Sequence, residues 1–350
     1  MESAKPKLLV TGITGYVGAW VTLKVLETDQ YSVRGTVRDK SNETKMQALK
    51  EAFGDHFDKI ELFNADLTDK ESLRIAAEGC DYVIHVASPF PLEDPKDEDE
   101  VIKPAVEGTT GILEAVKGTQ IKRVVITSSI VAIIDYTMGN IEVDETSWPS
   151  NLDVLTPYYK SKTLAERAAW DFIENLEEDE KFELVTINPG LVIGPLLTKG
   201  TGTSQKLFTD FMRGKFPSAP QIYTSVVDVR DVADAHVKAL TCEPYKRYAV
   251  VDDTYLLPDL CKMLRKEFRQ YGYKVTYRKT WKSTAYLASV FIKSIRQTLK
   301  SWKIRCHVKN DNAKKDLGID FIKAEKSMVD MGYSLIKHGF VPDKISKIKT

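Results

Sequence analysis

Short apolar runs alternate with longer amphipathic segments through most of the chain up to residue 240. The short runs have the length and apolar content of buried strands, and the longer segments repeat apolar residues with a helical period. Strands alternating with helices are typical of a parallel sheet covered by helices on both faces. The sequence therefore predicts an α/β fold with a doubly wound parallel sheet of the Rossmann type. The predicted strands span 7–11, 31–37, 59–66, 81–88, 122–129 and 182–190, and the predicted helices span 71–79, 100–118 and 158–176, after a first helix that ends near Glu27.

Three glycines, Gly12, Gly15 and Gly18, follow the first predicted strand and open the first predicted helix. Their spacing fits either a tight turn or a dinucleotide-binding fingerprint, and the strand before and helix after favour the fingerprint. Small residues let the backbone approach a pyrophosphate, whose charge the positive N-terminal end of the helix receives. We therefore predict a dinucleotide site formed by Thr11, Gly12, Gly15, Tyr16, Val17 and Gly18.

The second predicted strand ends at Arg38, where an NADP-selective site places an arginine near the 2′-phosphate of the cofactor. Because a guanidinium matches the geometry of a phosphate, Arg38 favours NADPH, unless it is an ordinary surface cation. Lys45 would add a second cation if the loop around it folds over the adenosine. Asp39 is the alternative, since it would accept hydrogen bonds from the ribose hydroxyls. Asp66, after the third strand, would accept from the adenine amino group or belong to the N-cap region of the next helix.

Tyr158 and Lys162 lie four residues apart on a predicted helix and therefore on one face of it. A phenol with a pKa of ~10 transfers a proton poorly at neutral pH unless a cation stabilises its phenolate, and Lys162 would supply that charge. Ser128 and Ser129 end the fifth predicted strand, at the edge where an open α/β sheet binds its ligands. A serine hydroxyl there would donate a hydrogen bond to a carbonyl oxygen that gains negative charge during hydride transfer. Without the serines, the Tyr and Lys would be interpreted as a structural pair.

In their order along the chain, these motifs resemble those of the extended short-chain dehydrogenases/reductases. Within that family they are most similar to the dihydroflavonol reductases, cinnamoyl-CoA reductases and methylglyoxal-type aldehyde reductases. The similar segments, which extend over nearly the whole chain, are TGITGYVGAW, VRDK, ADLTD, HVASPF, KPAVEGTTGILEAV, RVVITSS, YYKSKTLAERAAW, INPGLVIGP and VDVRDVADAH. The resemblance implies that Ser129 is the catalytic serine, Tyr158 the acid and Lys162 its partner. It also implies a bound NADPH, with further contacts from Leu67, Val86, Ala87, Ser88, Thr127, Pro189, Gly190 and Val192.

Three departures from the motifs of this family narrow the subfamily and the substrate that the resemblance implies. Ala105, in the segment AVEGT, stands where sugar-nucleotide epimerases of the wider family usually have Asn, which favours the reductases. Ile134, five residues after Ser129, stands where plant flavonoid reductases tend to have Asn or Asp to bind ring hydroxyls, which argues against a plant flavonoid substrate. The segment TPYYKSK lacks the Asn-Trp-Tyr-Cys run of cinnamoyl-CoA reductases, which argues against an acyl-CoA substrate.

The motifs together predict an NADPH-dependent reductase that transfers hydride to an aldehyde or ketone substrate, with Ser129, Tyr158 and Lys162 as its catalytic residues. A hydroxysteroid-type or secondary-alcohol dehydrogenase that works oxidatively with NAD(P) would use the same three residues and is the alternative. A regulator that senses NADP(H) without turnover is disfavoured, because all three side chains are intact.

The alternation of predicted strands and helices ends after Gly190 in loops rich in Gly and Pro. A strand and a helix follow at 223–240, and the rest of the chain is helical and basic. This change predicts a smaller, mainly C-terminal domain that binds the substrate. We expect the NADP-binding domain to comprise residues 1–189 and 220–252, and the substrate-binding domain to comprise residues 190–219 and 253–350.

Hydrophobic residues make up 43% of the composition and charged residues 29%, with 50 basic and 50 acidic side chains, which predicts a folded chain and argues against bulk nucleic-acid binding. The four cysteines lie far apart, with no His beside them at metal-ligand spacing, so we predict no metal site. The first strand begins at Lys7, which leaves no room for a secretory signal, and no apolar run reaches the ~20 residues of a membrane span. We therefore expect a cytoplasmic monomer or homodimer without stable membrane insertion.

The region from Cys261 to Asn310 holds fourteen Lys or Arg and one acid, Glu267. Three interpretations compete: a solvated helical face, a phosphate-binding rim for a charged substrate, and a weak docking surface for anionic membranes at 281–302. Charge runs are usually solvated faces, and we expect the apolar run at 285–292 to form a buried face of a helix. The sequence therefore favours the solvated face.

Four polar residues near these motifs are expected to be structural. His85 lies within an apolar strand and His236 on a helix, where hydrogen-bonded core positions are commoner than catalytic ones. Asp228 and Asp231 are expected to cap the helix that begins there.

Overall fold

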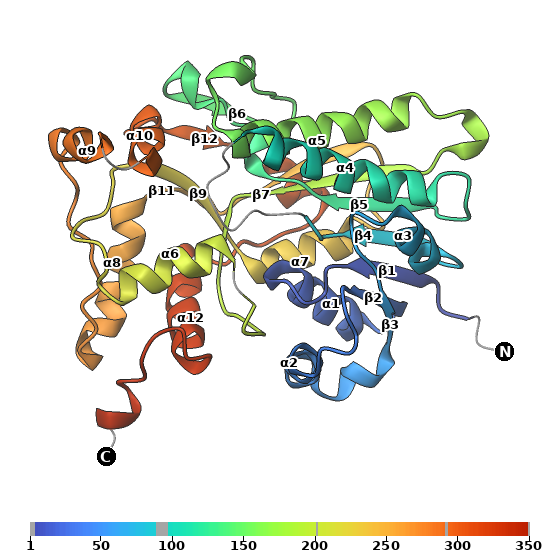
Figure 1. Ribbon diagram of the computed structural model, residues 1–350, viewed down its shortest axis with the longest axis horizontal. Coiled ribbons are helices and arrows are strands. Elements are labelled where there is room, and N and C mark those ends of the chain that lie inside the picture. The colour runs from blue at the N-terminus through green and yellow to red at the C-terminus, as the bar shows by residue number, and fades with distance from the viewer. Residues whose placement is uncertain (1–3, 89–96, 201, 291–292, 349–350) are drawn as a thin grey trace.

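The computed structural model describes residues 4–88, 97–200, 202–290 and 293–348. Its centre is a sheet of seven parallel strands in the order β10-β7-β5-β4-β1-β2-β3 (Figure 1). The predicted doubly wound sheet is thereby confirmed. Its strands are β1 (Lys7–Thr11), β2 (Ser32–Val37), β3 (Ile60–Asn64), β4 (Tyr82–His85), β5 (Arg123–Thr127), β7 (Glu183–Pro189) and β10 (Lys246–Val250).

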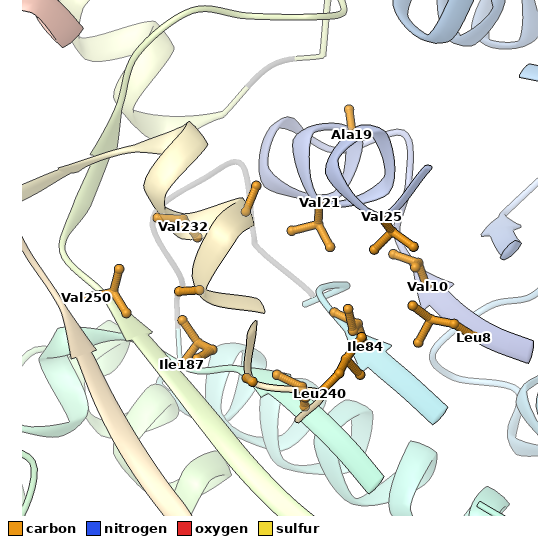
Figure 2. Close-up of a cluster of buried hydrophobic side chains, with 14 of the residues drawn as sticks. Leu8, Val10, Ala19, Val21, Val25, Ile84, Ile187, Val232, Leu240 and Val250 are labelled. Carbon is orange, nitrogen blue, oxygen red and sulfur yellow. The ribbon is translucent and has the colours of Figure 1, made fainter. Parts of the chain in front are cut away.

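Alternate side chains of the strands enter two separate cores, one on each face of the sheet. In β1, Leu8 and Val10 point into one core and Leu9 into the other. The first core lies under α1 (Tyr16–Thr28) and α7 (Val229–Lys238), and Figure 2 shows their valines facing the strands. The second core lies under α3 (Lys70–Ala77), α4 (Asp99–Val116) and α5 (Pro157–Glu174). Both faces are buried, which is why the strands read as nearly continuous apolar runs.

The sequence does not predict β10 as a separate strand, because its first two residues, Lys246 and Arg247, interrupt the apolar pattern. In the structure, Lys246 Nζ lies 2.8 Å from Asp316 Oδ2, and Arg247 Nε lies 2.6 Å from Glu166 Oε1. Each cation is therefore paired with a carboxylate from a distant segment, which allows charged residues to begin an edge strand of the sheet.

A second lobe begins where the chain leaves β7 at Pro189. Strands β8 (Leu191–Ile193), β9 (Tyr223–Asp228) and β11 (Asp253–Leu256) form a three-stranded sheet. Helices α6 (Thr203–Met212), α8 (Leu257–Phe268) and α12 (Ala324–Lys337) pack a separate core against it. The chain returns from β9 directly into α7, so the two lobes share a continuous connection at Asp228.

The most basic part of the chain forms α9 (Lys282–Ser289) and α10 (Lys293–Lys300), at the left end of Figure 1. Strand β12 (Cys306–Val308) then pairs with β6 (Ile141–Val143), and α11 (Asp311–Asp316) follows. The expected buried helix face at 285–292 is wrong for its described part, because Tyr286, Leu287 and Val290 are exposed. Residues 291–292 lie outside the described residues. Helical periodicity predicts which side chains share a face, but not whether another element covers that face.

In the described part of the chain, no helix is both long enough and apolar enough to cross a membrane.

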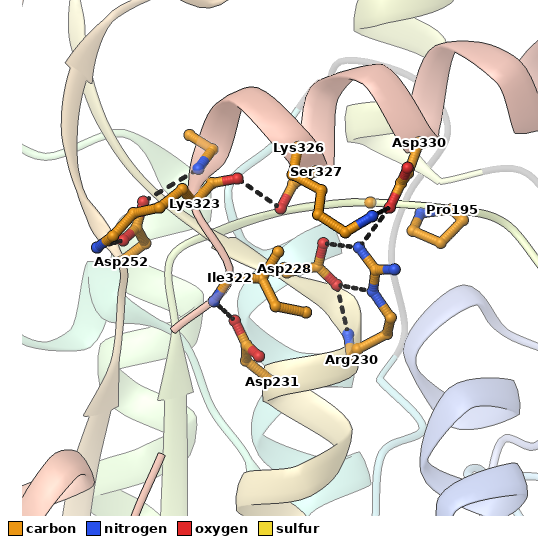
Figure 3. Close-up of polar contacts among 12 residues, drawn as sticks. Pro195, Asp228, Arg230, Asp231, Asp252, Ile322, Lys323, Lys326, Ser327 and Asp330 are labelled. Carbon is orange, nitrogen blue, oxygen red and sulfur yellow. Dashed lines mark hydrogen bonds and ion pairs between the residues drawn. The ribbon is translucent and has the colours of Figure 1, made fainter. Parts of the chain in front are cut away.

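Polar contacts attach the C-terminal segment to the start of α7 (Figure 3). Asp228 is the N-cap of α7 and accepts from the backbone N of Arg230 at 2.8 Å, as predicted. The Arg230 guanidinium also pairs with Asp228 at 2.7 Å and with Asp330 of α12 at 2.8 Å. The expected capping role of Asp231 is wrong, because its Oδ2 accepts from the backbone N of Ile322 at 2.9 Å. The carboxylate of Asp231 is thus buried against a distant segment.

Burial raises the pKa of Asp231 to about 7. Because this folded-state pKa lies above the ~3.9 of an unfolded aspartate, the stability from protonated Asp231 is complete below about pH 4 and is lost as pH rises through about 7. The Asp231→Asn variant keeps an oxygen that can accept from the backbone N of Ile322, but it cannot titrate. We expect it to remove the decline in the free energy of unfolding with pH, which is at most ~1.4 kcal/mol per pH unit. Urea unfolding from pH 4 to 8 measures it, with the exposed Asp320→Asn as control. Identical pH dependence in Asp231→Asn and the natural chain would contradict the assignment.

Candidate active site

The glycine-rich turn lies where the strand order of the sheet reverses. Strand β1 is flanked by β2 on one side and β4 on the other, so their carboxyl ends border the crevice where open α/β sheets bind ligands. Gly12 has a φ of +73°, and a Cβ there would lie 3.0 Å from Cα of Ala87. A Cβ on Gly18 would lie 2.1 Å from the carbonyl oxygen of Gly12. The turn therefore requires glycine at both positions.

The N-terminal end of α1 is open to a ligand in the described structure. Gly15 is its N-cap, no side chain caps it, and its first turn holds no acidic residue. The unpaired N–H groups and the positive dipole end of α1 can therefore receive a pyrophosphate. Tyr16 and Val17 begin the helix, and Tyr16 Oη donates to the carbonyl oxygen of Gly194 at 2.7 Å.

Thr11 and His85 connect β1 and β4 below this turn. Thr11 Oγ1 lies 3.0 Å from His85 Nδ1 and accepts from the backbone N of Ala87 at 3.2 Å. Burial lowers the pKa of His85 to about 3, so its ring is neutral. His85 is thus a hydrogen-bonded core residue, as expected, and His236 is another, with Nε2 2.7 Å from Thr127 Oγ1.

The residues expected around the adenosine lie at the ends of β2 and β3. The Arg38 side chain is 74% exposed, and its Nε lies 3.9 Å from Asp66 Oδ2. Asp39 is occupied by its own turn, because it accepts from Ser41 N at 2.8 Å and Ser41 Oγ at 2.6 Å. Lys45 lies in the first turn of α2 (Glu43–Phe53), so the expectation of a loop there is wrong.

The N-cap of α3 is Asp69, which accepts from the backbone N atoms of Glu71 and Ser72, and Asp66 lies in the same N-terminal region, where its backbone N donates to Ser72 Oγ at 3.1 Å. Asp66 Oδ1 instead accepts from Thr68 N at 2.9 Å and Oγ1 at 2.7 Å. These hydrogen bonds lower the pKa of Asp66, and nearby Arg38 adds to the effect. Asp66 is therefore an ionised acceptor beside an exposed guanidinium.

Ser129, Tyr158 and Lys162 come together beside this crevice. Ser129 is the second residue after β5, and Tyr158 and Lys162 lie in the first two turns of α5, whose N-cap is Thr156. The Tyr158 hydroxyl is hydrogen bonded to the Ser129 side chain. Lys162 Nζ donates to Ser88 Oγ, after β4, at 2.9 Å. Four polar side chains from two neighbouring strand ends and one helix thus converge.

Burial dominates the proton affinity of this cluster. It raises the pKa of Tyr158 above its usual 10, and the hydrogen bond from Ser129 opposes the shift. Tyr158 as a whole is 37% exposed. Burial lowers the pKa of Lys162 to about 8, and the carboxylate of Glu166 opposes that shift. The phenol therefore holds its proton at neutral pH beside a lysine of modest basicity.

Glu166 lies four residues after Lys162, as Lys162 lies four residues after Tyr158, so the three share one face of α5. The sequence motifs do not indicate Glu166 as a site residue. Its carboxylate is buried and accepts hydrogen bonds from side chains of three other segments. The donors are Arg247 Nε at 2.6 Å, Asn188 Nδ2 at 2.6 Å, Thr186 Oγ1 at 3.1 Å and Ser128 Oγ. The helical spacing of four was a usable signal, whereas nothing in the sequence indicates its partners.

This network also fixes the backbone that presents Ser129. Asn188 Nδ2 donates to the carbonyl oxygen of Ser129 at 3.2 Å. Arg247 Nη2 donates to the carbonyl oxygen of Ala132 at 3.1 Å, and its guanidinium lies 3.6 Å above the ring of Trp148. Because the hydroxyl of Ser128 is bonded to Glu166, only the second serine of the pair faces Tyr158.

The remaining predicted cofactor residues are distributed around the same edge. Pro189 ends β7, and a Cβ on Gly190 would lie 2.6 Å from the carbonyl oxygen of Ser225. Val192 lies in β8, and Leu67 and Val86 are partly buried against the two cores. Among the described residues, no group of His, Cys, Asp or Glu is arranged to hold a metal ion.

Comparison with known proteins agrees with this geometry. The model of the NAD dependent epimerase/dehydratase family matches residues 8–250. A cinnamoyl-CoA reductase of Medicago truncatula is 35% identical over 269 residues, covering 73% of this chain and 79% of the relative. Dihydroflavonol 4-reductase of Arabidopsis thaliana is 31% identical over 371 residues, covering 100% of this chain and 89% of the relative. A yeast methylglyoxal/isovaleraldehyde reductase solved with NADPH has a TM-score of 0.77 at 26% identity, covering 95% of this chain and 98% of that one.

Removal of the Glu166 carboxylate would leave the Arg247 guanidinium without its charge partner. We expect Glu166→Ala to lower the free energy of unfolding by ~3–5 kcal/mol, the usual effect of breaking a buried ion pair. Glu174→Ala, at an exposed position on the same helix, should change it by less than ~0.5 kcal/mol. Urea denaturation of both variants tests this expectation, and equal effects would show that the buried network is not stabilising.

Proposed function

Because the chain belongs to the NAD dependent epimerase/dehydratase family, the extended short-chain dehydrogenases/reductases, we propose that it is an NADPH-dependent reductase of aldehydes or ketones. The observation that carries this proposal is the convergence of Ser129, Tyr158 and Lys162 beside the glycine-rich turn. Relatives of the chain are named as reductases, and the yeast relative was solved with NADPH, which supports the same cofactor here.

The crevice fits a dinucleotide, because two glycine positions admit no Cβ and the N-terminal end of α1 has no side-chain cap. Gly12 to Gly18 would hold the pyrophosphate. Arg38 would bind the 2′-phosphate, and the exposed Lys45 would supply a second cation. Asp66 and Leu67 would contact the adenine. Ser88 and Lys162 would bind the nicotinamide ribose, and Thr127 and Pro189 to Val192 would border the nicotinamide. NADPH bound in this way supplies the hydride.

The proton would come from Tyr158. Its hydroxyl and that of Ser129 can both donate hydrogen bonds to one carbonyl oxygen, which gains negative charge as the carbonyl is reduced. Because the pKa of Tyr158 is raised, the phenol is protonated at neutral pH and holds a proton that it can give to the more basic alkoxide. Oxidation of an alcohol would use the same phenol, as phenolate, in the role of base, so these three residues serve either direction. Lys162, when protonated, stabilises the phenolate that remains after the transfer.

The segment after Ser129, which would face the substrate, presents few polar side chains to a ligand. Ile134 is buried and packs in an apolar cluster with Ile133 and Tyr136. Asp135, the next residue, accepts from the backbone N of Thr137 at 2.9 Å and is not available to a ligand hydroxyl. We therefore infer an apolar or aromatic carbonyl compound rather than a polyhydroxylated ring system.

Tyr158→Phe removes the proton donor and keeps the ring. We expect kcat/KM for aldehyde reduction to fall by at least ~10²-fold, while the Kd for NADPH is unchanged. A panel of aldehydes and ketones followed by NADPH absorbance identifies the assay substrate and tests the proposed activity. Comparable turnover by the Phe variant would exclude Tyr158 as the acid.

Ser129 and Ser128 form a matched pair for the same assay. Ser129→Ala should resemble Tyr158→Phe in its kinetics, whereas Ser128→Ala should affect turnover much less and lower the free energy of unfolding, since it removes a donor to Glu166. The reverse order of kinetic effects would assign the chemistry to Ser128.

Arg38→Ala should weaken NADPH binding and leave NADH binding nearly unchanged, because only the 2′-phosphate distinguishes the two. A charge-assisted hydrogen bond contributes ~1.5–3 kcal/mol, which corresponds to a roughly ten- to hundred-fold higher Kd for NADPH. Fluorescence titration with both cofactors measures this difference, with Lys40→Ala as a control at the neighbouring exposed cation. Equal losses for the two cofactors would assign Arg38 a structural role.

A further inference from the structure

Residues 278–290 and 293–303, which we call the basic hairpin, expose large apolar side chains. Trp281, Tyr286, Leu287 and Val290 are 78%, 68%, 71% and 63% exposed, on and beside α9. Ala285, on the opposite side of the same helix, is buried. The helix therefore uses small residues to pack on the protein and directs large apolar residues to solvent. An ordinary solvated face does not account for this arrangement.

Three cations of the basic hairpin have no acidic partner among the described residues. Among the ion pairs of the described residues, none involves Lys279, Lys282 or Lys303, whereas Lys309, beyond the hairpin, pairs with Glu142 at 2.8 Å. These three lysines line one cavity of about 580 Å³ together with Trp281 and the nearly buried Trp302. Three cationic side chains thus surround a hollow next to the exposed apolar helix.

A second cavity, of about 470 Å³, lies between α9 and α10. Tyr286, Val290 and Leu299 give it apolar walls, and Arg296 and Lys300 lie at its border. Arg296 Nη2 donates to the carbonyl oxygen of Ser289 at 3.2 Å, which ties the two helices together. A cavity lined by lysines and an apolar cavity bordered by cations therefore both adjoin α9. This helix lies at one end of the long axis of the molecule (Figure 1).

We propose that the basic hairpin docks the protein peripherally on membranes that contain anionic phospholipid. Trp281, Leu287 and Val290 would enter the boundary between headgroups and acyl chains, where amphipathic aromatic and aliphatic side chains are stable. Lys279, Lys282 and Lys303 would bind the phosphates of the headgroups. The surface lies on the interface without spanning the bilayer.

Charge and side-chain chemistry favour lipid over two other occupants. A two-fold contact with a second copy would bring the same unpaired lysines against one another, which opposes association. A single-stranded nucleic acid would use the lysines and stack on Trp281 and Tyr286, but it would gain nothing from exposed Leu287 and Val290. Of these three occupants, a lipid surface is the one that uses both the cations and the aliphatic side chains.

Co-sedimentation of the full chain with vesicles tests this proposal. We expect binding to vesicles of phosphatidylcholine containing phosphatidylserine, weak binding to phosphatidylcholine alone, and a decrease as salt rises. Lys279→Gln with Lys282→Gln should weaken binding to the anionic vesicles roughly ten- to thirty-fold, and the equally exposed pair Lys50→Gln with Lys59→Gln should not. Absence of binding at low salt, or equal losses in both double variants, would overturn the proposal.

The apolar contribution has its own variants and readouts. Leu287→Ser with Val290→Ser should abolish vesicle binding, whereas Ile75→Ser, an exposed apolar position on α3, should have no effect. Vesicles should shift the tryptophan emission to shorter wavelength, and Trp281→Phe should remove that shift. A dimer that dissociates in the Leu287→Ser, Val290→Ser variant would assign the surface to a second copy instead. Displacement of the vesicles by a single-stranded oligonucleotide would assign it to nucleic acid.

Discussion

The buried carboxylate of Glu166 is the constraint on which the candidate site depends. A carboxylate without water must be compensated by cations and donors with good geometry, and here Arg247, Asn188, Thr186 and Ser128 supply them. The donors come from β5, β7 and β10 or directly follow these strands, so the carboxylate connects α5 to three adjacent strands at once. An ion pair of this kind is a weak source of net stability, but its geometric demands restrict α5 to one position on the sheet.

That restriction reaches the chemistry through the helix itself. Lys162 and Tyr158 precede Glu166 by one and two helical steps on the same face, so the position of the carboxylate sets the position of the phenol. The same network holds the carbonyl oxygen of Ser129 through Asn188. The relative position of the serine hydroxyl and the phenol is therefore determined behind the site. The crevice can therefore be lined by glycines, which leave space for a ligand but do not orient the catalytic side chains.

Local patterns predict the sheet, the glycine-rich turn and the Tyr–Lys pair, because each depends on residues close together in the sequence. The Glu166–Arg247 pair joins residues 81 positions apart, and each side chain alone resembles a surface charge. The strand β10 is missed for the same reason, because its cations find their carboxylate partners only after folding. The sequence also predicts a capping role for Asp231, whose actual partner is the backbone of the distant Ile322. These failures have one physical origin, since the environment of a charged side chain is set by tertiary contacts.

The equal numbers of acidic and basic residues conceal an uneven distribution of partners. Arg34 and Arg123 are buried, and each pairs with a glutamate, at 3.0 and 2.6 Å, and with backbone carbonyl oxygens. Folding requires such partners, because an unpaired buried cation is unstable. An exposed lysine has no such requirement, and the lysines of the basic hairpin contribute no ion pair to the described structure. Folding therefore does not require their concentration beside exposed apolar side chains, and a contact with an anionic surface gives these lysines the partners that the fold does not supply.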